Sequence, residues 1–108
     1  MASAATFRTI ALSLEGTTDA PHFDRTAFKV VRIYATLASD GRTANLKFSP
    51  DEQELKCTVA ADVFASVPNA WGKQGWTTAI LSRLSEKELK SALETAWQHA
   101  LPKRKRRR

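Results

Sequence analysis

The chain has 108 residues, of which 43% are hydrophobic, and a formal net charge of +6. This length favours a single domain with one core, and the single cysteine, Cys57, excludes a framework of internal disulfides. The short apolar runs predict no membrane span, and the lack of a signal peptide at the N-terminus favours a cytoplasmic protein.

The first predicted element is a helix with one apolar face. A cap at Thr6 and a left-handed stop at Gly16 would bound this helix. Its apolar residues follow the i, i+3, i+4, i+7 spacing of a helix that buries one side. These residues are Phe7, Ile10, Ala11 and Leu14.

Residues 26–48 predict two or three antiparallel strands. β-branched and aromatic residues dominate the first half of this segment, but the apolar positions change parity along it. Such a change requires a tight turn or a bulge, which we place at Val31 and Arg32. Asp40-Gly41 is a hairpin turn signal, and the alternating residues 44–48 predict the strand that follows it.

A short second helix and a second hairpin come next. Ser49-Pro50-Asp51-Glu52 has the residues of a capping box with proline in the first turn. Residues 63–81 return to a strand pattern, in which Trp71 and Trp76 flank a Gly-Lys-Gln-Gly tetrapeptide. We interpret this tetrapeptide as a hairpin tip, and we expect both tryptophans to pack the hairpin onto the core.

The last helix follows another capping box, formed by Ser85 and Glu88, and stops at Pro102. The elements therefore predict an α+β fold in two layers, with an antiparallel sheet and its helices on one face, in the order α-β-β-β-α-β-β-α. The apolar stripe of the last helix is continuous. It consists of Leu89, Ala92, Leu93, Ala96, Trp97 and Ala100.

The whole net charge comes from the end of the chain. The last six residues are all basic, which leaves 11 of the 17 Lys and Arg to balance the 11 Asp and Glu. We therefore expect one domain over residues 1–102 and a basic tail over residues 103–108, which like-charge repulsion should keep disordered. Such a tail indicates an anionic partner.

Four segments of the chain carry a resemblance to a known family. They are Phe28-Lys29-Val30, residues 45–52, residues 67–77 and residues 96–103. They resemble the MmcQ/YjbR family, and residues 71–76 are the most specific part. The resemblance implies a small α+β fold related in shape to frataxin-like and secretion-chaperone-like domains, and DNA binding by two hairpin wings. The chain departs from the family at Val31-Arg32, where glycine is common.

The candidate nucleic-acid contacts lie on both hairpin tips, on the sheet face opposite the core, and in the tail. Tip and tail residues offer donors to phosphates or base edges. Solvated tips and an ordinary wet sheet face would produce the same pattern. The expected contacts are Arg42, Lys47, Lys73, Gln74, Lys103, Arg104, Lys105, Arg106, Arg107 and Arg108; the sheet face would also hold Lys29, Tyr34, Thr36 and Asn45.

The sequence offers little for catalysis. His22, Cys57 and His99 are far apart and have no metal-ligand spacing. We therefore expect a non-enzymatic protein without metal or cofactor. A frataxin-like iron binder would need acidic residues in the first helix, but Glu15 is the only acid before Gly16.

Two functional hypotheses follow. The first is a monomeric DNA-binding protein in which the tail attracts phosphates and the wings set the orientation. The alternative is a protein-interaction or chaperone-like module that binds a partner protein through its open sheet or a helix face.

Overall fold

The computed structural model describes residues 2–102. Six antiparallel strands form one sheet in the order β1-β2-β3-β4-β6-β5. The strands are β1 (Thr18–His22), β2 (Arg25–Lys29), β3 (Ile33–Ala38), β4 (Thr43–Lys47), β5 (Phe64–Ser66) and β6 (Trp76–Ile80). The helices are α1 (Ala4–Ser13), α2 (Pro50–Val59), α3 (Ala70–Lys73) and α4 (Glu86–Ala100), with a 3-10 turn at Leu81–Arg83.

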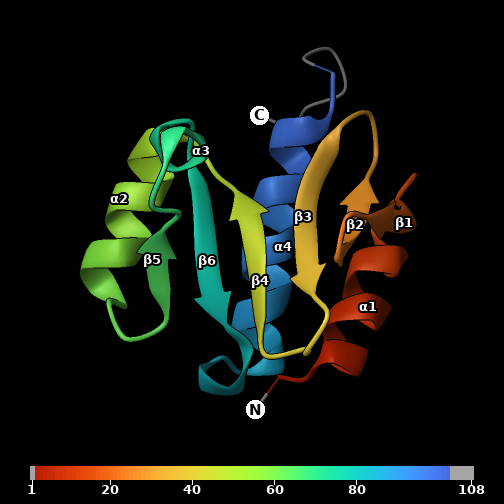
Figure 1. Cartoon of the computed structure of the whole chain (residues 1–108), viewed down its shortest axis with the longest axis horizontal. Coiled ribbons are helices and arrows are strands. Elements are labelled where there is room, and N and C mark those ends of the chain that lie inside the picture. Colours follow the sequence, from red (N-terminus) through yellow and green to blue (C-terminus); the bar gives the residue numbers. More distant parts are fainter. Residues whose placement is uncertain (1, 103–108) are drawn as a thin grey trace.

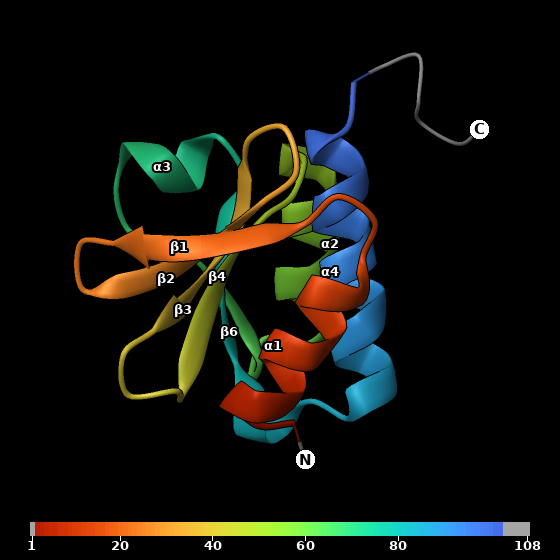
Figure 2. The ribbon, with the colours of Figure 1, turned by 90° about the vertical axis from the view of Figure 1, so that its right-hand side faces the viewer.

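The three longer helices cover one face of the sheet, and the other face is left open (Figure 1). Figure 2 shows α1, α2 and α4 together on one side, while α3 and the β1–β2 hairpin project toward the opposite side. The predicted fold class, α+β with an antiparallel sheet and helices on one face, is confirmed.

Four strands, β1 to β4, precede α2, whereas the sequence predicted three strands before this helix. The additional strand, β1, pairs with β2 at the edge of the sheet. All five of its residues are exposed, so its sequence shows no alternation between a buried and a solvated face. An edge strand without a buried face gives no periodic signal in the sequence.

Both capping boxes form as predicted, but the first helix begins earlier than expected. Ser3, and not Thr6, is the N-cap of α1, and the Ser3 side chain accepts a hydrogen bond from the Thr6 backbone N–H at 3.2 Å. In α2 and α4 the cap serine and the glutamate three residues later bond reciprocally. The caps depend on bonds within one helical turn, which explains why sequence reasoning finds them.

The parity change between β2 and β3 is a turn followed by a bulge. Phe28 pairs with Ala35 and Lys29 pairs with Ile33, which leaves Tyr34 as the additional residue. The bulge places Tyr34 in the core with no exposed surface, so its expected position on the solvated face is wrong. Its hydroxyl lies 2.9 Å from Thr17 Oγ1, and burial raises the pKa of the phenol.

The remaining residues of the open face follow the prediction. Ala27, Thr36, Asn45, Thr78 and Ala65 are successive partners across β2, β3, β4, β6 and β5, and their side chains share this face. Thr36 is nevertheless only 7% exposed, because the Arg25 side chain covers it and Arg25 Nε donates to its hydroxyl at 2.8 Å.

Candidate nucleic-acid interface

The connection between β5 and β6 is a helical turn and not the simple hairpin tip that the sequence suggested. β5 and β6 do pair antiparallel, but residues 70–73 between them form α3, which Asn69 caps. Gln53 on α2 anchors this turn, because its Nε2 donates to the carbonyl oxygens of Gly72 and Trp76, both at 2.9 Å. The turn is thus attached to the body.

The two glycines of this connection are structural. A Cβ on Gly72 would lie 1.8 Å from the Val67 carbonyl oxygen, and a Cβ on Gly75 would lie 1.9 Å from that of Phe48. Gly75 also has a φ of +109°, which L side chains rarely adopt. The most specific part of the sequence resemblance is therefore explained by close backbone packing.

Trp71 does not pack on the core, and the prediction that it does is wrong. Its side chain is 58% exposed. Because residues 70–73 are helical, the small Gly72 faces the body and its large neighbour points to solvent. Trp76 is partly buried and pairs with Lys47 at the end of β4, on the open face.

Replacing Trp71 with alanine is expected to change the free energy of unfolding by less than about 1 kcal/mol, because an exposed side chain leaves no cavity. Phe28→Ala is the matched comparison, since Phe28 is fully buried and its truncation should cost about 3 to 5 kcal/mol. Urea unfolding measures both values. Equal losses in the two variants would contradict the exposed position of Trp71.

Lys73 and Gln74 are exposed at the end of α3, close to the end of β4. The Phe48 N–H donates to the Gly75 carbonyl at 3.1 Å, which continues the β4–β6 pairing beyond Lys47. The structure therefore brings Lys47, Lys73 and Gln74 to one end of the sheet (Figure 1).

Arg42 lies at the opposite end of the sheet. It is exposed beside the β3–β4 turn, where its N–H donates to Asp40 Oδ1 at 2.9 Å. Arg42 precedes β4 and Lys47 ends it, so at about 3.3 Å per residue roughly 16 Å separates their backbones. The predicted contacts on the two tips are not neighbours (Figure 1).

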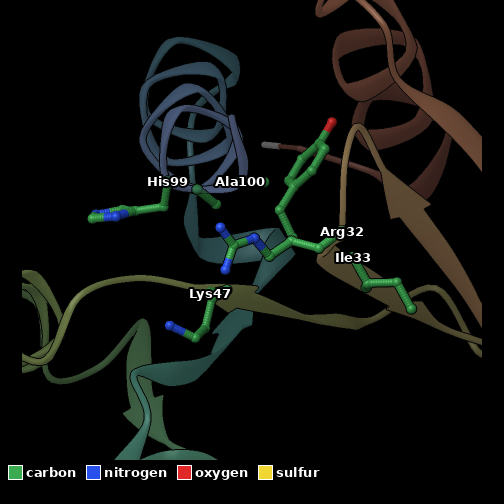
Figure 3. Close-up of a pocket in the computed structure, with 7 residues that line it drawn as sticks. Arg32, Ile33, Lys47, His99 and Ala100 are labelled. Atoms are coloured by element: carbon green, nitrogen blue, oxygen red, sulfur yellow. The ribbon is translucent and has the colours of Figure 1, made fainter. Parts of the chain in front are cut away.

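A pocket of about 160 Å³ lies beside Lys47. Arg32, from the β2–β3 turn, extends into the space between His99 on α4 and Lys47 on β4 (Figure 3). Burial, and next the charge of Arg32, lowers the pKa of the Lys47 ammonium. The pocket is lined by Arg32, Ile33, Tyr34, Lys47, Ala96, His99 and Ala100.

Sequence reasoning placed Arg32 in the turn between the strands but not among the contacts. No spacing rule links residue 32 to residues 47 and 99, because the three belong to a turn, a strand and a helix that meet only in the folded protein. One feature of the sequence could have pointed to Arg32. It is a basic residue at a position where glycine is common in the MmcQ/YjbR family.

His99 joins the end of α4 to the start of α2. Its Nε2 lies 2.5 Å from Glu52 Oε1, which also accepts the Ser49 N–H at 3.0 Å. Burial alone would raise the pKa of the Glu52 carboxyl, but the bonds from Ser49 and His99 hold it below its usual value. Glu52 therefore serves both a helix cap and a contact between two helices.

Protonating Glu52 is expected to destabilise the fold. A carboxyl with a lowered pKa in the folded state stabilises the protein above its unfolded-state pKa, near 4.3, and this contribution is lost as the pH falls through the lowered value. Glu52→Gln should therefore reduce the loss of stability between about pH 5 and pH 3. Urea unfolding as a function of pH measures the difference.

Glu88→Gln is the matched control for this pH dependence. Glu88 forms the other capping box and also has a lowered pKa, caused by the Ser85 backbone and side chain, but no histidine is bonded to it. Its substitution should flatten the pH dependence less. A Glu52→Gln variant with the acid sensitivity of the unmodified chain would refute the assignment.

Over residues 2–102, no cluster of three or more His, Cys, Asp or Glu side chains is placed to hold a metal ion. No helix in the described range is long and apolar enough to cross a membrane. The six predicted contacts of the tail, residues 103–108, lie outside the described residues.

The fold is similar to two solved bacterial structures, while a search of the curated proteins finds no match. A Deinococcus radiodurans protein with a DUF419 domain has 19% identity and a TM-score of 0.81, with 95% of this chain and 81% of that chain covered. A Pseudomonas syringae protein has 19% identity and a TM-score of 0.67, with 90% and 97% covered.

At such identities the structural likeness concerns the fold. The family is shown by the sequence itself, because the family model described as YjbR matches residues 12–99, which is most of the chain. The chain therefore belongs to the YjbR family, with residues 12–99 as the matching part.

Proposed function

We propose that this protein binds DNA through the phosphate backbone and catalyses no reaction. The observation that carries the proposal is the position of the cations. Arg32, Lys47 and Lys73 come from three different segments and lie at the end of the sheet where α4 ends. The basic tail, residues 103–108, follows this end of α4 after only Leu101 and Pro102.

The cations of the folded domain and those of the tail would contribute differently to DNA binding. A run of six positive charges attracts phosphates without regard to sequence and makes the affinity strongly dependent on salt. Cations fixed on the fold set the orientation and register of the protein on the duplex. Gln74 and the exposed ring of Trp71 belong to the same short connection as Lys73 and offer a hydrogen bond donor and a stacking surface.

Lys73→Ala is expected to weaken duplex binding by the full-length protein severalfold, because one phosphate contact is lost. The fold should be unchanged, since the side chain is exposed. Arg42→Ala is the matched variant at the opposite end of the sheet. A fluorescence anisotropy titration at a fixed salt concentration measures both affinities.

The two variants together determine the orientation of the duplex. A loss of affinity for Lys73→Ala alone would indicate DNA across the end of the sheet where α4 ends, whereas a loss for both variants would indicate DNA along the length of the sheet. If neither variant changes the affinity, the proposal that cations of the folded domain contact DNA is refuted.

In that event the partner-protein alternative becomes the better proposal. One observation favours it, namely that Phe23 is 93% exposed in the turn of the projecting β1–β2 hairpin (Figure 2). Its φ of +58° is uncommon for a bulky residue. Exposed aromatic side chains are frequent anchors at protein interfaces.

A further inference from the structure

The pocket beside Arg32 and Lys47 is suited to a single anionic group. Its volume of about 160 Å³ is roughly five times the share of one water molecule in the liquid, about 30 Å³. Ile33, Ala96 and Ala100 contribute apolar surface, and the other four lining side chains, Arg32, Tyr34, Lys47 and His99, are polar. Two of these polar side chains, Arg32 and Lys47, are basic.

The positive charges of this pocket are not neutralised from within the fold. Among residues 2–102, no carboxylate forms an ion pair with Arg32, and the Lys47 ammonium bonds only to the Phe48 carbonyl oxygen, at 3.4 Å. Glu52, the carboxylate whose charge acts on Lys47, is already bonded to Ser49 and His99. The charge of Glu52 raises the pKa of Lys47, but burial and the charge of Arg32 together lower this pKa by more.

The hydroxyl of Tyr34 is bonded away from the pocket. Tyr34 lines the pocket, but its hydroxyl is 2.9 Å from Thr17 Oγ1 and 3.4 Å from the Ala11 carbonyl oxygen, on the side of α1. The basic groups among the lining residues that can meet an anion are the planar guanidinium of Arg32 and the ammonium of Lys47.

We propose that this pocket binds one phosphate group, held by Arg32 and Lys47. A guanidinium matches two phosphate oxygens in a fork, while an ammonium contributes a point charge to a third. A phosphate has enough oxygens and negative charge to bridge both cations at once. The proposal goes beyond DNA binding by the tail, because the site would exist whatever the tail contacts. The phosphate is either free or the terminal phosphate of a nucleic-acid strand.

The experiment is a titration of the ¹⁵N-labelled full-length protein with inorganic phosphate, followed by NMR, with sodium chloride held at equal ionic strength as the reference. We expect saturable shifts of the Arg32 side-chain Nε–H and of the backbone amides of Ile33 and Ala100, which line the pocket. Linear shifts, or shifts confined to residues 103–108, would overturn the proposal.

Two variants test the assignment of the cations. Lys47→Met keeps the aliphatic stem and removes the charge, and Arg32→Gln changes an exposed turn residue. Each should weaken phosphate binding about tenfold, the effect of one lost charge-assisted hydrogen bond. Lys87→Gln, which removes an exposed charge from the first turn of α4, is the control and should leave the affinity unchanged. Equal affinities in all three variants would refute the site.

A second titration identifies the source of the phosphate. Short single strands with and without a 5′-phosphate are added to the full-length protein and to Lys47→Met. Shifts at Ile33 and Ala100 that require the 5′-phosphate and disappear in the variant assign a strand terminus, and shifts with inorganic phosphate alone assign a free phosphate. Failure of DNA binding would leave the inorganic phosphate titration unaffected, so the two proposals fail separately.

Discussion

Deleting residues 103–108 is expected to remove most of the affinity for duplex DNA and most of its dependence on salt. If all six cations engage phosphates, the slope of log affinity against log salt should be steeper by about 5 in the full-length protein, at −0.9 per phosphate contacted. A slope of this size corresponds to about a thousandfold change in affinity between 50 and 200 mM salt. Anisotropy titrations of both proteins at several salt concentrations measure it.

The loss should be the same for specific and scrambled duplexes, because point charges on a tail read charge density and not base edges. Any sequence preference should remain in the truncated protein and should depend on Lys73 and Gln74. A truncated protein with the slope and affinity of the full-length chain would show that the tail serves a partner other than nucleic acid.

Gly75→Ala is expected to destabilise the fold strongly. The new methyl group would lie 1.9 Å from the Phe48 carbonyl oxygen, and the φ of +109° is unfavourable for alanine. Backbone would have to move on both sides of the β4–β6 pair, since Phe48 N–H donates to the Gly75 carbonyl. We expect a loss of more than about 3 kcal/mol in the free energy of unfolding.

Gly41→Ala is the matched control, because Gly41 also has a positive φ, +73°, but an added methyl group would meet only the Ala4 Cβ, at 3.0 Å. The cost of a left-handed conformation alone is about 1 to 2 kcal/mol. Thermal and urea unfolding of both variants separate the steric contribution from the conformational one. Similar losses in the two variants would argue against tight packing at Gly75.

The position of the cations also relates the pocket to the last helix. His99 and Ala100 line the pocket and belong to the last turn of α4. A phosphate bound between Arg32 and Lys47 would therefore lie close to the C-terminal end of α4. The proposed phosphate site and the proposed DNA contacts share these two cations and are tested separately.

Most of the secondary structure could be predicted from the sequence because its signals are local. The capping boxes at Ser49 and Ser85 require only a serine and a glutamate three residues apart. Asp40-Gly41 sets a hairpin because glycine adopts a positive φ there. The apolar stripe of α4 predicted its buried face, and five of its six residues are buried.

The site depended on contacts between distant segments. A bulge of one residue moved Tyr34 from the open face into the core, and a short helix turned Trp71 outward and Gly72 inward. No local pattern specifies either, because both result from the register and packing of neighbouring strands.

The charge of the tail and the identity of the basic residues were thus determined by the sequence alone. Which cations share a surface was decided by the tertiary structure. Antiparallel pairing brings the start of β3, the end of β4 and the start of β6 to the same end, so Arg32, Lys47 and Lys73 gather there. The same pairing separates Arg42 from them by the length of β4, because the two ends of a strand cannot approach each other.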